Sequence, residues 1–126
     1  MKKIIKTSQA PLPIGPYNQA VVIGNLIYLA GQIPLELKTN NVIAGGVAAQ
    51  TQLVIEHIKA ILSQAGSSLE KTVKATVFLK NMNDFAEMNK IYSQHFKPEF
   101  APARSTVEVA RLPRDVLVEI EIVAFI

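Results

Sequence analysis

The chain has 126 residues, which is the size of one domain, residues 1–126, with enough length to bury a hydrophobic core. Its net charge of +3 comes from scattered lysines rather than from a basic run with interleaved aromatic residues, so nucleic-acid binding is not favoured. The absence of cysteine excludes disulfides, thiolate nucleophiles and cysteine-bound metals, and no apolar run reaches the length of a membrane span. We therefore expect a soluble, cytoplasmic protein with no membrane partner.

The first third of the chain is predicted to contain short strands and loops. Lys3–Lys6 predicts a strand at a sheet edge, and the three prolines within residues 10–17 predict a loop, because proline cannot donate to a strand ladder. Residues 18–23 and 26–30 predict a hairpin in which Gly-Asn forms a two-residue turn. A polar loop and a Gly-Gly pair then lead to the first helix.

Two helices are predicted from apolar side chains spaced three and four residues apart. The first spans residues 47–65 and is followed by Gly66 as a C-terminal cap, and the second begins at Asn81 or Asn83 and runs to about His95. Thr72–Leu79 predicts a strand between them. The two apolar stripes consist of Val54, Ile58, Ile61, Leu62 and Ala65 in the first helix and Phe85, Met88, Tyr92 and Phe96 in the second.

The C-terminal region alternates polar and apolar residues over Ala103–Val109 and again over Val116–Val123. Leu112–Asp115 lies between the two stretches and has the composition of a turn. We expect the two strands to pair as a hairpin, with both apolar faces turned to one core. That register places five polar residues together on the opposite face, which predicts a ligand site there. They are Arg104, Thr106, Glu108, Glu119 and Glu121.

The order strand, hairpin, helix, strand, helix, hairpin is typical of an α+β fold in which two helices cover one face of a single sheet. The other face must meet water or another subunit. Leu117 and Val123 lie beside glutamates on that predicted face and favour an oligomer with polar sites between subunits. His57 and His95 are expected on helix surfaces, far apart and without metal-ligand spacing, so we expect no metal site.

Several motifs resemble, in matching order over essentially the whole chain, the RidA family, also called the YjgF/YER057c/UK114 family. They are I-G-P-Y at 14–17, A-G-Q-I-P at 30–34, K-A-T-V-F-L at 74–79, N-D-F-A at 83–86, P-A-R-S at 102–105 and V-L-V-E-I-E at 116–121. The resemblance implies a chorismate-mutase-like subunit with a mixed sheet, assembled as a homotrimer with clefts between subunits. It also implies hydrolysis of reactive enamines and imines, above all 2-aminoacrylate and related 2-imino acids, to 2-oxo acids and ammonia, without a cofactor.

The resemblance assigns three catalytic positions. Arg104 matches the arginine that binds the substrate carboxylate, for which a guanidinium offers a bidentate grip. Glu119 matches the glutamate that orients the hydrolytic water, and the hydroxyl of Tyr17 could contact substrate or water. Without the resemblance, Arg104 would more often form an ion pair with one of the strand glutamates, and Tyr17 would as readily pack over the sheet. Glu121 is expected to be structural.

Three further positions complete the expected substrate-binding set. Gly31 lets the backbone approach the ligand, Asn89 matches a residue that lines the site, and Thr106 offers its backbone N–H to the carboxylate. Alone on a helix, Asn89 would more often be solvated surface. Many enzymatic relatives have cysteine at Thr106 and some have serine at Ala30, so the turnover rate and the preferred imino acid stay open.

Two other classes of function remain open at this stage. One is a trimeric regulatory or ligand-binding protein that captures small carboxylates without turnover. The other is a translation- or RNA-directed activity, which some members of the family have been assigned.

Overall fold

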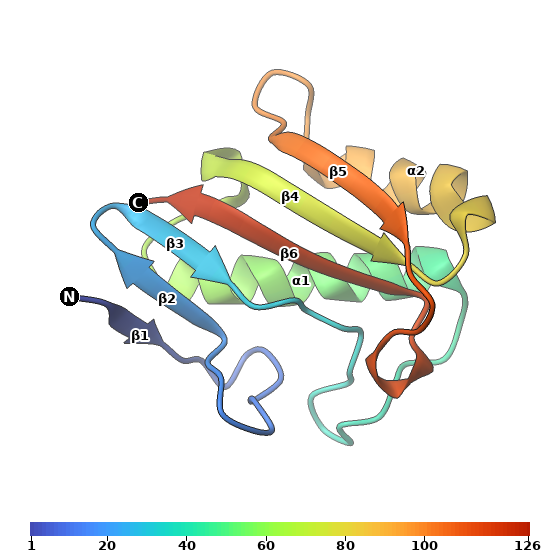
Figure 1. The fold of residues 1–126 in the computed structure, drawn as a ribbon, viewed down its shortest axis with the longest axis horizontal. Coiled ribbons are helices and arrows are strands. Elements are labelled where there is room, and N and C mark those ends of the chain that lie inside the picture. Colours follow the sequence, from blue (N-terminus) through green and yellow to red (C-terminus); the bar gives the residue numbers. More distant parts are fainter.

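Six strands form one mixed sheet in the order β1-β2-β3-β6-β4-β5 in the computed structural model, which describes all residues from 1 to 126 (Figure 1). All neighbouring strands are antiparallel except β4 and β5, which are parallel. The strands are Lys3–Ile5 (β1), Ala20–Ile23 (β2), Leu26–Leu29 (β3), Thr72–Leu79 (β4), Ala103–Glu108 (β5) and Val118–Phe125 (β6).

Two helices, α1 (Val47–Gln64) and α2 (Phe85–His95), lie on the same face of this sheet, and the other face is open (Figure 1). Short 3-10 turns at Leu69–Lys71, Met82–Asp84 and Pro113–Asp115 connect the elements. The prediction of one sheet with two helices on one face is confirmed. Neither helix combines the length and hydropathy that a transmembrane span needs.

Local turn and cap signals explain where several elements begin and end. Gly24 adopts a positive φ of 59° in the two-residue turn between β2 and β3, a conformation that glycine adopts without a Cβ penalty. Gly66 has a φ of 79° and follows Ala65, the C-cap residue of α1, at the position where the sequence predicts a terminating glycine. The side chain of Asn81 accepts a hydrogen bond from the backbone N–H of Asn83 at 2.9 Å and caps the 3-10 turn that continues into α2.

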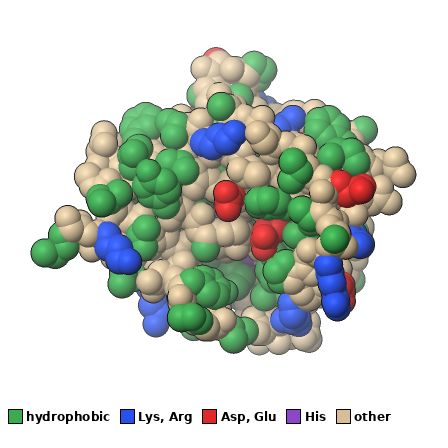
Figure 2. Space-filling view, viewed as in Figure 1, with side chains coloured by type: hydrophobic (Ala, Val, Ile, Leu, Met, Phe, Trp, Pro, Cys, Tyr) green, Lys and Arg blue, Asp and Glu red, His purple; other side chains and the backbone are tan.

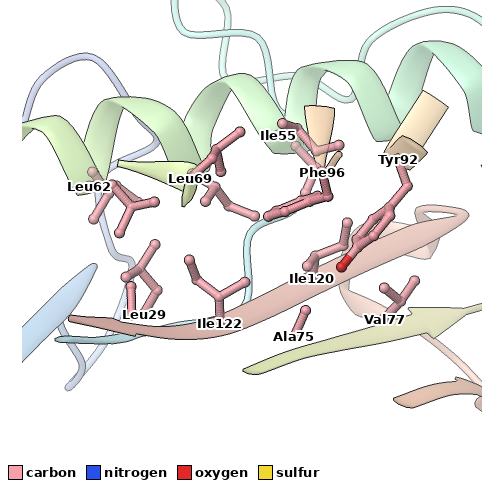
Figure 3. Close-up of a cluster of buried hydrophobic side chains, with 14 of the residues drawn as sticks. Leu29, Ile55, Leu62, Leu69, Ala75, Val77, Tyr92, Phe96, Ile120 and Ile122 are labelled. Carbon is pink, nitrogen blue, oxygen red and sulfur yellow. The ribbon is translucent and has the colours of Figure 1, made fainter. Parts of the chain in front are cut away.

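The hydrophobic core lies between the helices and the covered face of the sheet (Figure 3). Val77 of β4 and Ile120 of β6 are fully buried, as is Ile55 of α1, and Tyr92 and Phe96 reach toward the sheet from the α2 side with their rings stacked at 4.4 Å. Every second residue of β6 from Val118 to Ala124 is buried in this layer. The predicted apolar stripes therefore face one core.

The expected C-terminal hairpin is wrong, because β4 lies between β5 and β6. The chain leaves β4, crosses through α2 and returns as β5 parallel to β4, at the edge of the sheet. It then turns through Pro113–Asp115 and runs back as β6 between β3 and β4. Alternation in a sequence specifies which side chains share a face, but it does not specify which strand is the neighbour.

The new strand order also corrects the predicted shared face. Arg104 is level with Ala75 of β4, which is level with Ile122 of β6, so Arg104 points to the helix side of the sheet. Glu119 is level with Phe78 and points to the open side. Arg104, Thr106 and Glu108 thus share the helix side, whereas Glu119 and Glu121 share the open side.

The expected exposure of His57 is wrong. Its side chain is buried, at 2% exposure, and its Nε2 lies 2.8 Å from the backbone oxygen of Leu35, in the loop after β3. Burial lowers the pKa of His57, which favours the neutral ring. His95 is half-buried and bonds to Gln52 of α1 at 2.9 Å, so both histidines connect parts of the fold.

Candidate functional site

The six predicted site residues form two groups on opposite faces of the sheet. Arg104, Asn89 and Thr106 belong to β5 and α2, on the helix side. Tyr17, Gly31 and Glu119 belong to the loop before β2, the segment just after β3 and the start of β6, around the open side. One copy of the chain therefore does not bring the predicted arginine and glutamate together.

The guanidinium of Arg104 has a defined orientation without a carboxylate partner. Its Nη1 donates to Oδ1 of Asn89 at 2.7 Å, and its central carbon lies 4.6 Å from the ring centroid of Tyr92 and 5.5 Å from that of Phe85. Both rings present faces that attract a cation. The two salt bridges of the chain join Lys59 to Glu56 and Arg111 to Asp115. Arg104 thus forms no ion pair with a strand glutamate. The remaining N–H groups of Arg104 are available to an anion.

A hollow at the α2–β5 edge, with a volume of about 340 Å³, opens beside this guanidinium. Asn89, Tyr92 and Arg104 line it from one side, and the loop through Pro98 and Pro102 lines it from the other. The amide oxygen of Asn89 accepts the hydrogen bond from Arg104. Asn89 is therefore not a freely solvated surface residue. We call this feature the arginine hollow.

Thr106 lies two residues after Arg104 on the same face of β5, next to buried Val77. Its Oγ1 is buried and has no hydrogen-bond partner in the chain. A buried hydroxyl without a partner costs free energy, of the order of 1–3 kcal/mol. Such an atom, on the same face of β5 as Arg104, is suited to contact a polar ligand.

Glu119 is partly buried on the open face, and its pKa is raised above the ordinary glutamate value. Burial is the larger cause, because it disfavours the charged carboxylate, and the negative charge of Glu121 adds to it. Gly31 packs directly against this side chain. A Cβ at Gly31 would lie 2.8 Å from Cδ of Glu119, so glycine is needed there to make room for the carboxylate.

Tyr17 and Gly31 line a second hollow, with a volume of about 170 Å³, which we call the tyrosine hollow. Tyr17 is 52% exposed, and its Oη accepts a long hydrogen bond of 3.4 Å from the backbone N–H of Ile14. The other walls are mainly apolar and come from Pro11, Leu12, Ile14, Ile33, Leu35 and Pro113. The open face carries acidic side chains near its centre, above a hollowed region (Figure 2). Tyr17 thus borders an open hollow instead of packing over the sheet.

Comparison with known proteins places the chain in a family. A family model described as Endoribonuclease L-PSP matches residues 7–126. A RutC family protein of Pyrococcus abyssi is 54% identical over 124 residues, which is 98% of this chain and 97% of that protein. The chain belongs to the RidA (YjgF/YER057c/UK114) family.

Solved structures of RidA-family proteins have the same fold. The YjgF gene product of E. coli is 50% identical, with a TM-score of 0.91 and 98% of both chains covered. E. coli TdcF, solved with bound serine, is 45% identical, again with a TM-score of 0.91 and 98% of both chains covered. The family resemblance in the sequence is therefore confirmed.

Two residues that contact the candidate site were predicted only as part of the core or not at all. Tyr92 was expected in an apolar stripe, yet its ring also lies against the guanidinium of Arg104. Gln19 is fully buried, and its carboxamide bonds to the backbone of Thr7, Ala10 and Pro11, which fixes the loop bordering the tyrosine hollow. For Tyr92, the available signal was an aromatic residue on the helix that precedes β5, the strand that carries Arg104. For Gln19, a single glutamine in a loop gave no signal of its role.

Proposed function

We propose that the protein is a homotrimeric 2-iminobutanoate/2-iminopropanoate deaminase. It hydrolyses enamine and imine intermediates, such as 2-aminoacrylate and related 2-imino acids, to 2-oxo acids and ammonia, without a cofactor. One observation carries the proposal. Arg104 and Glu119 lie on opposite faces of the same sheet, each in an open and chemically suited environment, so a site that uses both needs two copies of the chain.

In this assembly, the open face of one copy meets the α2–β5 edge of the next. Cyclic symmetry repeats the contact, so each of three clefts combines an arginine hollow with the Glu119 face of a neighbour. The open face has large apolar side chains for such a contact: Tyr28 is 44% exposed and Val107 is 40% exposed. A sheet face of this kind is usually covered by another layer.

Arg104 is assigned to bind the substrate carboxylate. Asn89 and the ring of Tyr92 fix the guanidinium before a ligand arrives, which lowers the ordering cost of binding. The remaining N–H groups can form paired hydrogen bonds with a carboxylate, and the hydroxyl or the backbone N–H of Thr106 can add a further contact. The C=N carbon next to that carboxylate would then face the neighbouring subunit.

Glu119 is assigned to orient and activate water. Its carboxylate accepts a proton as the water oxygen forms a bond with the imine carbon, and the C=N double bond becomes a single C–N bond. The protonated carboxyl then returns this proton to the nitrogen, which gives a carbinolamine. The carboxylate next takes the proton of the new hydroxyl and passes it to the amino nitrogen, so that the C–N bond breaks, the C=O bond forms and ammonia leaves. A pKa raised by burial suits both halves of this cycle, because the group gains and loses a proton more readily near neutral pH.

Tyr17 and Gly31 support this step in the proposal. Gly31 leaves the space that Glu119 occupies, and Tyr17 can direct its hydroxyl to the substrate nitrogen or the water. Glu121 keeps a structural and electrostatic role, since its charge helps to raise the pKa of Glu119.

A second candidate is capture of small carboxylates without turnover. The serine-bound structure of TdcF supports it, because serine carries the same carboxylate that the arginine hollow is suited to bind. The description of the family model also names an endoribonuclease. Hydrolysis of RNA by the purified protein, with no effect on imines, would favour that activity over both others.

The test is to generate 2-aminoacrylate in situ with a serine dehydratase and to follow the disappearance of the imine. We expect wild-type protein to accelerate hydrolysis and Glu119→Ala to lose mainly turnover while it still binds 2-oxo acids. Binding of 2-oxo acids by wild-type protein, without acceleration of imine hydrolysis, would instead support the capture function.

A further inference from the structure

Four buried hydroxyl groups have no hydrogen-bond partner in the chain. Such a group costs free energy, because it loses its hydration on folding and receives no partner in exchange. Two of them, in Thr51 of α1 and Thr72 at the start of β4, lie outside the lining of the arginine hollow. The other two belong to the surroundings of Arg104. Thr106 is two residues further along the same face of β5, and Tyr92 lines the hollow.

Packing alone does not explain the hydroxyl of Tyr92. The side chain is 6% exposed, and its ring stacks on Phe96 and lies against the guanidinium of Arg104. A phenylalanine would make both contacts without burying a polar oxygen, and Phe85 already presents such a ring to the same guanidinium. The hydroxyl oxygen instead points from α2 toward the sheet (Figure 3). It lowers the stability of the free chain, and a contact that forms only with a ligand would offset this loss.

The hydroxyl of Tyr92 is a neutral group close to a charged one. Burial raises the pKa of Tyr92, because it disfavours the phenolate, and the positive charge of Arg104 opposes this rise. The phenol therefore keeps its proton at neutral pH, and its oxygen has lone pairs that can accept a hydrogen bond. A neutral acceptor can hold a guanidinium without cancelling the positive charge that attracts an anion.

The guanidinium of Arg104 has more donors than its contacts use. An arginine side chain carries about five N–H groups. One donates to Asn89, and a carboxylate held by a paired contact would use about two more. About two N–H groups then remain, and they would be cut off from water by the ligand on one side and by the rings on the other. The buried oxygen of Tyr92 is an acceptor in the same place that has no donor.

We propose that Tyr92 is a positioning residue, whose hydroxyl accepts a hydrogen bond from Arg104 when the guanidinium holds a substrate carboxylate. This inference rests on the proposed role of Arg104. In the free chain the guanidinium lies over the ring and the hydroxyl has no partner. In the bound state an inner N–H turns to the hydroxyl while the outer pair holds the anion. The hydroxyl thus increases the affinity for a carboxylate and lowers the stability of the free chain.

The experiment uses Tyr92→Phe, which removes the hydroxyl and keeps the ring. Titration calorimetry gives the Kd for 2-oxobutanoate, hydrolysis of 2-aminoacrylate gives KM and kcat, and scanning calorimetry gives the unfolding temperature of the free protein. We expect Kd and KM to rise about ten-fold with little change in kcat, and the unfolding temperature to rise by about 2–5 °C. A hydroxyl that only stabilised the fold would change the unfolding temperature in the opposite direction.

Thr72→Val is the matched control, because Thr72 is 4% exposed and its hydroxyl also has no partner. This change is expected to raise the unfolding temperature and to leave the Kd for 2-oxobutanoate unchanged. In an Arg104→Ala background, Tyr92→Phe is expected to lower kcat/KM no further, since the hydroxyl acts through the guanidinium.

The possible failures are distinguishable. Unchanged Kd and KM in Tyr92→Phe, a lower unfolding temperature, or an equal loss of affinity in Thr72→Val would overturn the positioning role and leave the deaminase function intact. A further ten-fold loss in the Arg104→Ala background would overturn action through the guanidinium. Weaker binding of 2-oxobutanoate by Tyr92→Phe, with no imine hydrolysis by wild-type protein, would support the positioning role and overturn the deaminase function.

Discussion

Replacement of Arg104 by alanine tests the proposed carboxylate site. The change removes the only group in the arginine hollow that can pair with an anion by charge, and it leaves the hydrogen-bond acceptor of Asn89 without its partner. Truncation of one member of a desolvated charge pair costs about 2–5 kcal/mol. Because Arg104 is only half-buried, we expect the lower part of that range, about 2–3 kcal/mol, which corresponds to a loss of about 30- to 150-fold in kcat/KM.

The assay is hydrolysis of 2-aminoacrylate generated in situ, at several imine concentrations, so that KM and kcat are obtained separately. Arg111→Ala is the matched control, since the Arg111 side chain is 78% exposed and pairs with Asp115 in a surface salt bridge of small energetic value. We expect Arg111→Ala to retain wild-type kcat/KM. Equal kcat/KM for wild-type protein and Arg104→Ala would refute the assignment of this guanidinium to the substrate.

Three further changes test the surroundings of the two charged groups. Gly31→Ala should lower kcat strongly with the fold retained, because the new Cβ would displace the Glu119 carboxylate; Gly46→Ala is the control, since a Cβ there meets nothing within 4 Å. Glu121→Gln should shift the acidic limb of the pH–rate profile to lower pH, because removal of its charge lowers the pKa of Glu119, and the base works only when deprotonated. Asn89→Ala should raise KM by about ten-fold or more with a smaller change in kcat, since a hydrogen bond to a charged group contributes about 1.5–3 kcal/mol.

Each of these has a clear contrary result. Full activity in Gly31→Ala would mean that the Glu119 carboxylate can move without consequence. An unchanged acidic limb of the pH–rate profile in Glu121→Gln would mean that the activity does not depend on the ionisation of Glu119. An unchanged KM in Asn89→Ala would mean that the orientation of the guanidinium does not depend on this amide.

Much of the fold could be predicted because the signals were local. The three- and four-residue spacing around Val54 and Ile58 identified α1, and Gly24 and Gly66 marked a turn and a cap that the backbone dihedral angles confirm. The pairing of β5 could not be predicted from its alternation. The position of β4 between β5 and β6 depends on the crossover through α2, which is a property of the whole chain.

The same limit applies to the candidate site. The family motifs identified Arg104 and Glu119, but the sequence placed them on one face of a hairpin that does not exist. Alternating polar and apolar residues in two strands do not specify whether their polar side chains share a face of the sheet, because the relative register of β5 and β6 depends on β4 between them. The separation of the two residues became visible only in three dimensions, and it is the observation that makes a site between subunits necessary for the proposed reaction.

Mixing of inactive subunits tests that claim most directly. Arg104→Ala and Glu119→Gln chains, each of strongly reduced activity alone, are unfolded together in equal amounts, refolded and assayed, with each variant refolded alone as the control. If each site combines Arg104 of one copy with Glu119 of the next, random assembly leaves about one quarter of the sites with both residues, and about one quarter of the wild-type kcat returns. Refolded mixtures whose activity stays as low as that of the separate variants, although the subunits have exchanged, would contradict the account.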